Sequence, residues 1–162
     1  MYSWVLIYFI QRLLMWTYNK KEFTDDMIPE GAIGFIYGIS LKIDGESKLY
    51  IGKKNFYSDV KTKLGKKELS DITDKRKKTY KRVRKYTYKN YCSSNDIIKR
   101  SVKDGIPIKK NILKICYSKM DLTYQELKYL VKLDVLEDDK YLNDNILGKF
   151  YKSKINKTSN NE

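Results

Sequence analysis

Histidine is absent from this chain of 162 residues, and cysteine and proline occur only twice each. The lack of histidine excludes His-based triads and removes the usual general base and the commonest metal ligand. Any hydrolytic site here has to use tyrosine, lysine, carboxylate or metal-bound water. Cys92 and Cys116 lie far apart without the spacing of metal ligands, which argues against a disulfide framework or a zinc site. Two isolated cysteines are typical of a protein of the reducing cytoplasm.

Long apolar runs are also missing. The run Trp4–Trp16 has only thirteen residues and is interrupted by Gln11 and Arg12, so it is too short to span a bilayer. It also lacks the leading basic residues and the small-residue cleavage site of a signal peptide. An amphipathic packing helix and a segment lying on a membrane surface are two of the interpretations of residues 4–16.

Positive charge is abundant and unevenly distributed. The chain has 34 Lys and Arg against 20 Asp and Glu, a net charge of +14. Residues 53–103 hold 18 of the basic and 5 of the acidic residues, a net of +13, and the rest of the chain is nearly neutral with 16 and 15. This concentration predicts a segment that binds a polyanion, with a solvated basic loop as the alternative.

Two β-type runs flank Asp44-Gly45, a strong hairpin signal because both residues tolerate positive φ. If these two residues form the centre of the turn, Tyr37 lies opposite Gly52 and Tyr50 lies opposite Ile39. The two tyrosines then share one face and border a shallow pocket beside the glycine. A loop of three or five residues would place them on opposite faces. An ordinary half-buried hairpin with core tyrosines is the alternative interpretation.

The stretch from Lys53 to Arg84 has few large aliphatic residues and shows neither helical nor strand periodicity. We expect an exposed basic excursion that follows a phosphate backbone, with salt-sensitive binding and little base preference. The tyrosines between Tyr80 and Tyr91 either stack on bases or anchor the excursion to the core.

Later segments carry clear element signals. Ser93 and Ser94 precede a predicted helix, in which a serine accepts a hydrogen bond from an early backbone N–H and Gly105 provides the stop. Residues 108–116 predict a third strand. Thr123 and Glu126 then have the spacing of a capping box at the start of a second helix, a role that would account for Glu126 by itself.

The runs Gly34-Phe35-Ile36-Tyr37 and Tyr50-Ile51-Gly52 resemble the paired motifs of the GIY-YIG endonucleases. The serine-led helix, the third strand, the glutamate helix and a closing asparagine follow in the family's order, from about residue 16 to residue 150. Cys92 stands where several members have histidine. The resemblance is closest to small stand-alone proteins of tailed phages, some of which begin with a sequence similar to Met15-Trp16-Thr17-Tyr18. Residues 1–14 are then an extension before a start at Met15.

The resemblance implies a Mg²⁺-dependent endonuclease that cuts DNA, with Mn²⁺ able to substitute. It assigns Glu126 as the metal ligand and Tyr37 as the general base toward a water, with Tyr50 orienting that water or sharing its hydrogen-bond network. A tyrosine with an ordinary pKa near 10 is a poor base at neutral pH, so neighbouring lysines and the metal are expected to lower the pKa of Tyr37. Asn143, preferred over Asn145, steadies the site.

One part of the family pattern is missing. Members use an arginine soon after the second motif to contact the scissile phosphate, whereas Lys53 and Lys54 follow Gly52 here. Lys53 is expected to substitute electrostatically, or Arg82 or Arg84 to fold back, although lysine lacks the planar fork of arginine. The residues expected to contact DNA are Lys53, Lys54, Lys77, Lys78, Lys81, Arg82, Arg84, Lys85, Ser93 and Ser94.

The predicted fold is α+β, with a small three-stranded antiparallel sheet flanked by helices. The nuclease-like domain is expected over residues 31–150 with a basic insertion at 53–91, after an extension and connector over 1–30 and before a polar tail over 151–162. DNA is the expected partner in the cytoplasm, the host's if the protein is phage-encoded, and no small-molecule cofactor is expected. A catalytically inactive DNA-binding protein on the same fold, and a virion or host-takeover interaction protein, are the two alternatives.

Overall fold

The structure, a computed structural model, describes residues 15–74 and 80–155, apart from the side chain of Arg82. A five-stranded sheet forms its centre, with the strand order β2-β1-β7-β3-β4. These strands are β1 (Trp16–Tyr18), β2 (Lys21–Glu22), β3 (Gly34–Ile43), β4 (Glu46–Asn55) and β7 (Ile108–Cys116). The α+β class is confirmed, but the prediction of a three-stranded sheet is wrong, because β1 pairs in parallel with β7 and β2 extends it further.

The hairpin of β3 and β4 has the predicted register. Asp44 and Gly45 both have positive φ, at 50° and 82°, and Ile43 pairs directly with Glu46. A two-residue turn of this kind matches the twist of the flanking strands. Tyr37 therefore lies opposite Gly52, and Tyr50 shares its face of the sheet.

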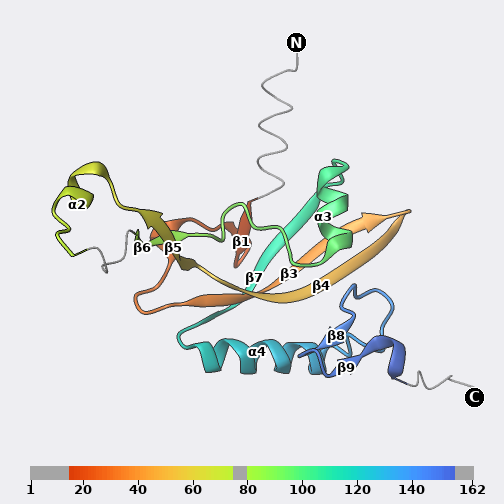
Figure 1. The fold of residues 1–162 in the computed structure, drawn as a ribbon. Helices are drawn as coiled ribbons and strands as arrows, with labels where there is room; N and C mark the ends of the chain where they lie inside the picture. The colour runs from red at the N-terminus through yellow and green to blue at the C-terminus, as the bar shows by residue number, and fades with distance from the viewer. Residues whose placement is uncertain (1–14, 75–79, 156–162) are drawn as a thin grey trace, which may run out of the picture.

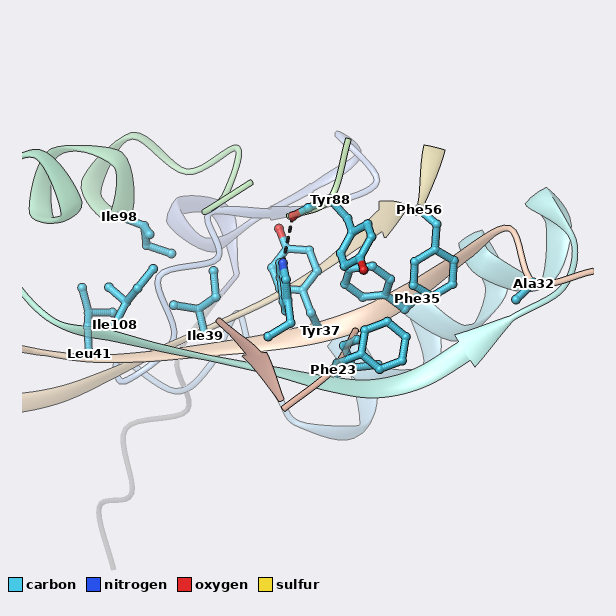
Figure 2. Packing of buried hydrophobic residues seen from close by; sticks show 12 residues of the cluster. Phe23, Ala32, Phe35, Tyr37, Ile39, Leu41, Phe56, Tyr88, Ile98 and Ile108 are labelled. Carbon is cyan, nitrogen blue, oxygen red and sulfur yellow. Dashed lines mark hydrogen bonds between the residues drawn. The ribbon is translucent and has the colours of Figure 1, made fainter. Parts of the chain in front are cut away.

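The two faces of the sheet carry separate cores. One face buries Phe35 and Tyr37 of β3 against Trp16 and other aromatic residues, and Figure 2 shows this row of rings. The opposite face buries Ile36 and Ile51 under α4 (Lys119–Lys132). Figure 1 shows α4 along that face and α3 (Asp96–Lys103) on the other side of the sheet.

Residues 16–28 contribute more to the domain than a connector would. Trp16 and Phe23 are both buried in the aromatic core, and the indole N–H of Trp16 donates to the backbone carbonyl of Tyr88 at 2.8 Å, the dashed line in Figure 2. A short 3-10 helix, η1 (Asp25–Met27), leads on towards β3. Residues 1–14, including most of the apolar run, lie outside the described residues. No helix in the described part of the chain is long and apolar enough to cross a membrane.

Both longer helices are capped by residues other than those predicted. Asn95, and not a serine, caps α3 by accepting hydrogen bonds from the N–H groups of Ile97 and Ile98, while Ser93 accepts from the N–H of Asn95. Ser118 caps α4, so Thr123 lies inside the helix and the predicted capping box with Glu126 is wrong. The carboxylate of Glu126 is therefore not used for capping.

The basic excursion forms a two-stranded ribbon of β5 (Tyr57–Lys63) and β6 (Tyr80–Tyr86), with the short α2 (Lys66–Ser70) beyond β5. Figure 1 shows the ribbon and α2 projecting past one end of the central sheet. Its stem is fixed by Phe56, which is fully buried. The N–H of Phe56 donates to the carbonyl of Ile33, and its carbonyl accepts from the N–H of Thr87.

The C-terminal segment closes the edge of β4. Leu49 exchanges backbone hydrogen bonds with Lys140 and Leu142, which gives a short parallel bridge to Tyr141. Beyond this point lie β8 (Asn145–Ile146), β9 (Phe150–Tyr151) and the 3-10 helix η2 (Lys152–Lys154), so the first residues of the predicted tail are ordered.

A lysine is buried in the aromatic core. Lys110 of β7 is 2% exposed, and its ammonium donates to the backbone carbonyls of Lys89 and Tyr91 at 3.2 and 3.1 Å. It also lies 4.6 Å from the centre of the Trp16 ring. Burial lowers the pKa of Lys110 to about 8. The loop that carries Tyr91 is thus held by a cation that loses its proton within the experimental pH range.

We expect the stability of the protein to rise with pH above about 8 because of Lys110. Its folded pKa lies below that of an unfolded lysine, so between these values the unfolded chain binds more protons and the free energy of unfolding increases by up to about 1.4 kcal/mol per pH unit. Urea unfolding of wild type and Lys110→Met at pH 7.5, 8.5 and 9.5 measures this term as the difference between the two curves. A difference independent of pH would contradict it.

Candidate active site at the edge of the central sheet

A cleft of about 450 Å³ lies where the edge of β4 meets α4 and the turn before α3. Segments far apart in the sequence form its wall. The lining residues are Tyr50, Ile51, Lys53, Ser94, Asn95, Asp96, Glu126, Leu130, Asn143, Asp144, Asn145 and Leu147. Four of the six residues predicted to be catalytic, Tyr50, Lys53, Glu126 and Asn143, are therefore brought together.

Tyr37 and Tyr50 pack on either side of the space left by Gly52. Their ring centres are 6.2 Å apart, and a Cβ atom on Gly52 would lie only 2.6 Å from the hydroxyl of Tyr37. Tyr37 is fully buried behind the cleft, and its hydroxyl donates to that of Tyr91 at 3.3 Å. The hydroxyl of Tyr50 forms a hydrogen bond with Ser94 at 3.1 Å. Tyr50 is the phenol of the pair that lines the cleft.

The protonation of these phenols differs from the expectation. Burial raises the pKa of Tyr37 far above its ordinary value, and the nearby phenols of Tyr91 and Tyr50 add to the shift. Burial likewise raises the pKa of Tyr50, with the carboxylate of Glu126 among the smaller contributors. The prediction that the surroundings lower the pKa of Tyr37 is wrong for the free protein, because the loss of water and the neighbouring phenols both disfavour the phenolate.

Glu126 points into the cleft from the middle of α4. Its carboxylate lies 3.0 Å from the ammonium of Lys53, which also donates to the hydroxyl of Thr123 at 3.0 Å. The side chain of Glu126 is 17% exposed and that of Lys53 is 34% exposed, so both are accessible from the cleft. Lys53 is thus the nearest cation to the acid in the free protein.

Asn143 is committed to the backbone of β4. Its side-chain oxygen accepts from the N–H of Ile51 at 3.0 Å, and its amide donates to the carbonyl of Ile51 at 2.8 Å. The side-chain amide of Asn143 thus pairs with the backbone of Ile51 as a neighbouring strand would, and it fixes β4 between Tyr50 and Gly52. Asn145, the rejected alternative, instead accepts from the N–H of Gly148 within a local turn.

The other predicted contacts are more scattered. Ser94 lines the cleft, whereas Ser93 is buried beneath it, and the ammonium of Lys54 lies 4.4 Å from the ring centre of Tyr91. Arg84 does not line the cleft. Lys81 and Lys85 are exposed on β6 of the ribbon, and the backbone of Arg82 lies between them. Lys77 and Lys78 lie outside the described residues.

The sequence analysis missed three residues of the site. Tyr91 covers the hydroxyl of Tyr37, and the carboxylate residues Asp96 and Asp144 line the same cleft as Glu126. Asp144 directly follows Asn143 in the sequence, and this neighbourhood is the one local signal for Asp144. Tyr91 and Asp96 carry none, because they reach the site only through the folding of the loop before α3.

A divalent cation fits this set of residues in one way. Among the described residues, no three His, Cys, Asp or Glu side chains lie close enough to form a closed metal site. Mg²⁺ does not need such a cage, because it is commonly held by one or two carboxylates together with water and substrate phosphate. The accessible carboxylate of Glu126 is suited to that arrangement.

The chain was also compared with known proteins. Residues 16–146 match the family model described as "Putative endonuclease segE, GIY-YIG domain", which covers most of the chain and includes β1. Searches of curated proteins and of solved structures gave no match. The match spans both tyrosine motifs, the helix with Glu126 and the segment with Asn143. The chain belongs to the GIY-YIG endonuclease family.

Proposed function

We propose that the protein is a Mg²⁺-dependent endonuclease that hydrolyses phosphodiester bonds of DNA, with Mn²⁺ able to substitute. The observation that carries the proposal is the meeting of Tyr50, Lys53 and Glu126 in one cleft. The two hydrogen bonds between the side chain of Asn143 and the backbone of Ile51 support it, because they hold β4 in place. A phenol, a cation and an acid within one accessible hollow are groups that can serve phosphodiester hydrolysis without histidine.

Glu126 would hold the metal. When bound there, the ion supplies stabilisation of the negative charge on the phosphate and on the leaving oxygen. The contact between Lys53 and Glu126 supports this role, because a cation already lies at the carboxylate in the free protein. Lys53 lies beside this carboxylate, where its ammonium would act on the phosphate as a point charge in place of the family's arginine.

The two tyrosines divide the work. We assign the water contact to Tyr50 in place of Tyr37, the general base expected from the family resemblance, because Tyr37 is fully buried behind the cleft whereas Tyr50 lines it. In our proposal Tyr50 contacts the attacking water from the cleft. Tyr37 holds the ring of Tyr50 from behind Gly52 as a positioning residue, with Tyr91 on its hydroxyl.

DNA approaches over the basic segment. The basic residues proposed to contact DNA lie on β4 and on the ribbon that continues it: Lys54, Lys81, Arg82, Arg84 and Lys85. Ser94 lies at the cleft. Their contacts would be mainly with phosphates, so binding weakens steeply with salt.

Plasmid cleavage tests the proposal. Wild type should nick or linearise a plasmid with Mg²⁺ or Mn²⁺ and not with EDTA, and Tyr50→Phe should reduce kcat by about 10²-fold or more if the hydroxyl takes part in proton transfer. Tyr124→Phe is the matched control, since Tyr124 is 58% exposed on α4 and does not line the cleft. Salt-sensitive DNA binding without any metal-dependent product would instead support an inactive DNA-binding protein.

A further inference from the structure

A second hollow, of about 520 Å³, lies between the base of the ribbon and the first turn of α4. No step of the proposed chemistry uses it. Its lining residues are Ile33, Asn55, Tyr57, Ser58, Asp59, Arg84 and Lys119. Five of these residues bring polar or charged groups to the wall, and Ile33 and Tyr57 bring apolar surface.

The second hollow continues the line of the cleft. Asn55 and Lys53 are alternate residues of β4, so their side chains leave the same face of the strand. Lys119 and Glu126 lie on the same side of α4, about two turns or roughly 10 Å apart along the axis. The bond from Lys53 to Thr123 joins β4 and α4 between the two hollows. The two hollows therefore lie along the same face of β4 and the same side of α4.

The chemistry of the hollow suits an anion with several oxygens. Arg84 offers a planar guanidinium, Lys119 an ammonium and Asn55 an amide. The guanidinium lies over the ring of Tyr57 at 4.5 Å, and its Nε is 3.8 Å from the carboxylate of Asp59. The side chains of Arg84 and Asp59 are 67% and 52% exposed, so this long contact is weak and orients the arginine without occupying it.

We propose that this hollow is a docking site for a backbone phosphate of the DNA, separate from the phosphate that reacts. This inference rests on the proposed function. Phosphates of one strand recur every ~3.4 Å along the duplex axis, so two sites roughly 10 Å apart along α4 can be reached by two different phosphates of the same DNA. Arg84 is then a binding residue and does not contact the reacting phosphate. The absence of an arginine from the described walls of the cleft follows from this division.

The test separates binding from chemistry with Arg84→Ala and Lys119→Ala. Fluorescence anisotropy with a short DNA duplex in EDTA gives Kd, and cleavage with Mg²⁺ gives KM and kcat. We expect Kd and KM to rise about tenfold for each variant with kcat within about twofold, and the slope of log Kd against log salt to fall by about one. Lys128→Ala is the control, because this exposed lysine lies on the opposite side of α4 from Lys119.

Each contrary outcome has its own meaning. A collapse of kcat in Arg84→Ala with unchanged Kd would place the arginine at the reacting phosphate and overturn the docking site. Effects no larger than those of Lys128→Ala would also overturn it, while leaving the endonuclease intact. Binding that depends on Arg84 and Lys119 in a wild type that never cuts would support the docking site and overturn the proposed endonuclease.

Discussion

Glu126→Gln is expected to lower kcat for Mg²⁺-dependent DNA cleavage by about 10³-fold or more. The change keeps the size of the side chain and its ability to accept a hydrogen bond from Lys53, but it removes the charge that would hold the metal. A loss of about 4 kcal/mol of transition-state stabilisation corresponds to this factor. The fold should survive, because both partners of the ion pair are partly exposed.

The measurement combines single-turnover cleavage with Mn²⁺ titration followed by calorimetry. Glu126→Gln should lose both cleavage and the calorimetric signal of Mn²⁺ binding to the complex with DNA, while its affinity for DNA in EDTA stays close to that of wild type. Glu137→Gln removes the same charge from an exposed residue that does not line the cleft and serves as the control. Undiminished cutting by Glu126→Gln would remove the metal-ligand assignment.

Gly52→Ala is expected to destabilise the protein by about 2–3 kcal/mol and to abolish cleavage. The added Cβ would lie 2.6 and 2.7 Å from the hydroxyl and the Cζ atom of Tyr37, and 3.0 Å from the Tyr50 ring. Tyr37 is fully buried and cannot move without disturbing the aromatic core. Overpacking of a close-packed core has a cost of this size, and the displaced rings would no longer align with the cleft.

Gly38→Ala is the matched control for this prediction. It makes the same change on β3, where the nearest atom to the added Cβ would be 3.7 Å away, an ordinary contact. Because alanine loses less backbone freedom than glycine on folding, this variant should be as stable as wild type or slightly more so. Urea unfolding of both variants decides the matter. Equal stability of the two would contradict the role given to Gly52.

The hairpin could be predicted because its determinants are local. Alternating residues and Asp44-Gly45 define the register, and the register alone places Tyr37 and Tyr50 on one face. The full burial of Tyr37 could not be predicted in the same way. Tyr37 is covered by Tyr91, which comes from a loop that Lys110 holds in place, and no pattern within the hairpin predicts this cover.

The start of α4 shows where local signals compete. Both Ser118 with Asp121 and Thr123 with Glu126 have the spacing of a cap and an acid, so the sequence offers two starts. The earlier start places Leu122 inside the helix, where it is buried against the sheet. Tertiary packing therefore determines which of the two starts is used, and the side chain of Glu126 faces the cleft instead of capping the helix.

The additional strands were missed for a similar reason. β1 and β2 have three and two residues, too few to show a periodicity, and they are held by the burial of Trp16 and Phe23 in the aromatic core. The family resemblance grouped Glu126 with Asn143, and both line the cleft, whereas spacing alone assigned Glu126 to a helix cap. The sequence offered no comparable signal for the hollow at Arg84, because its walls come from β4, the ribbon and α4.

The stem at Phe56 has a consequence for how such a protein can evolve. Hydrogen bonds from Phe56 to Ile33 and from Thr87 to Phe56 pin both legs of the ribbon to the domain before the ribbon leaves it. Insertions or deletions beyond the stem leave the spacing of Tyr50 and Lys53 untouched. The ribbon can therefore change in length and sequence by mutation, while the candidate active site at its base keeps its geometry.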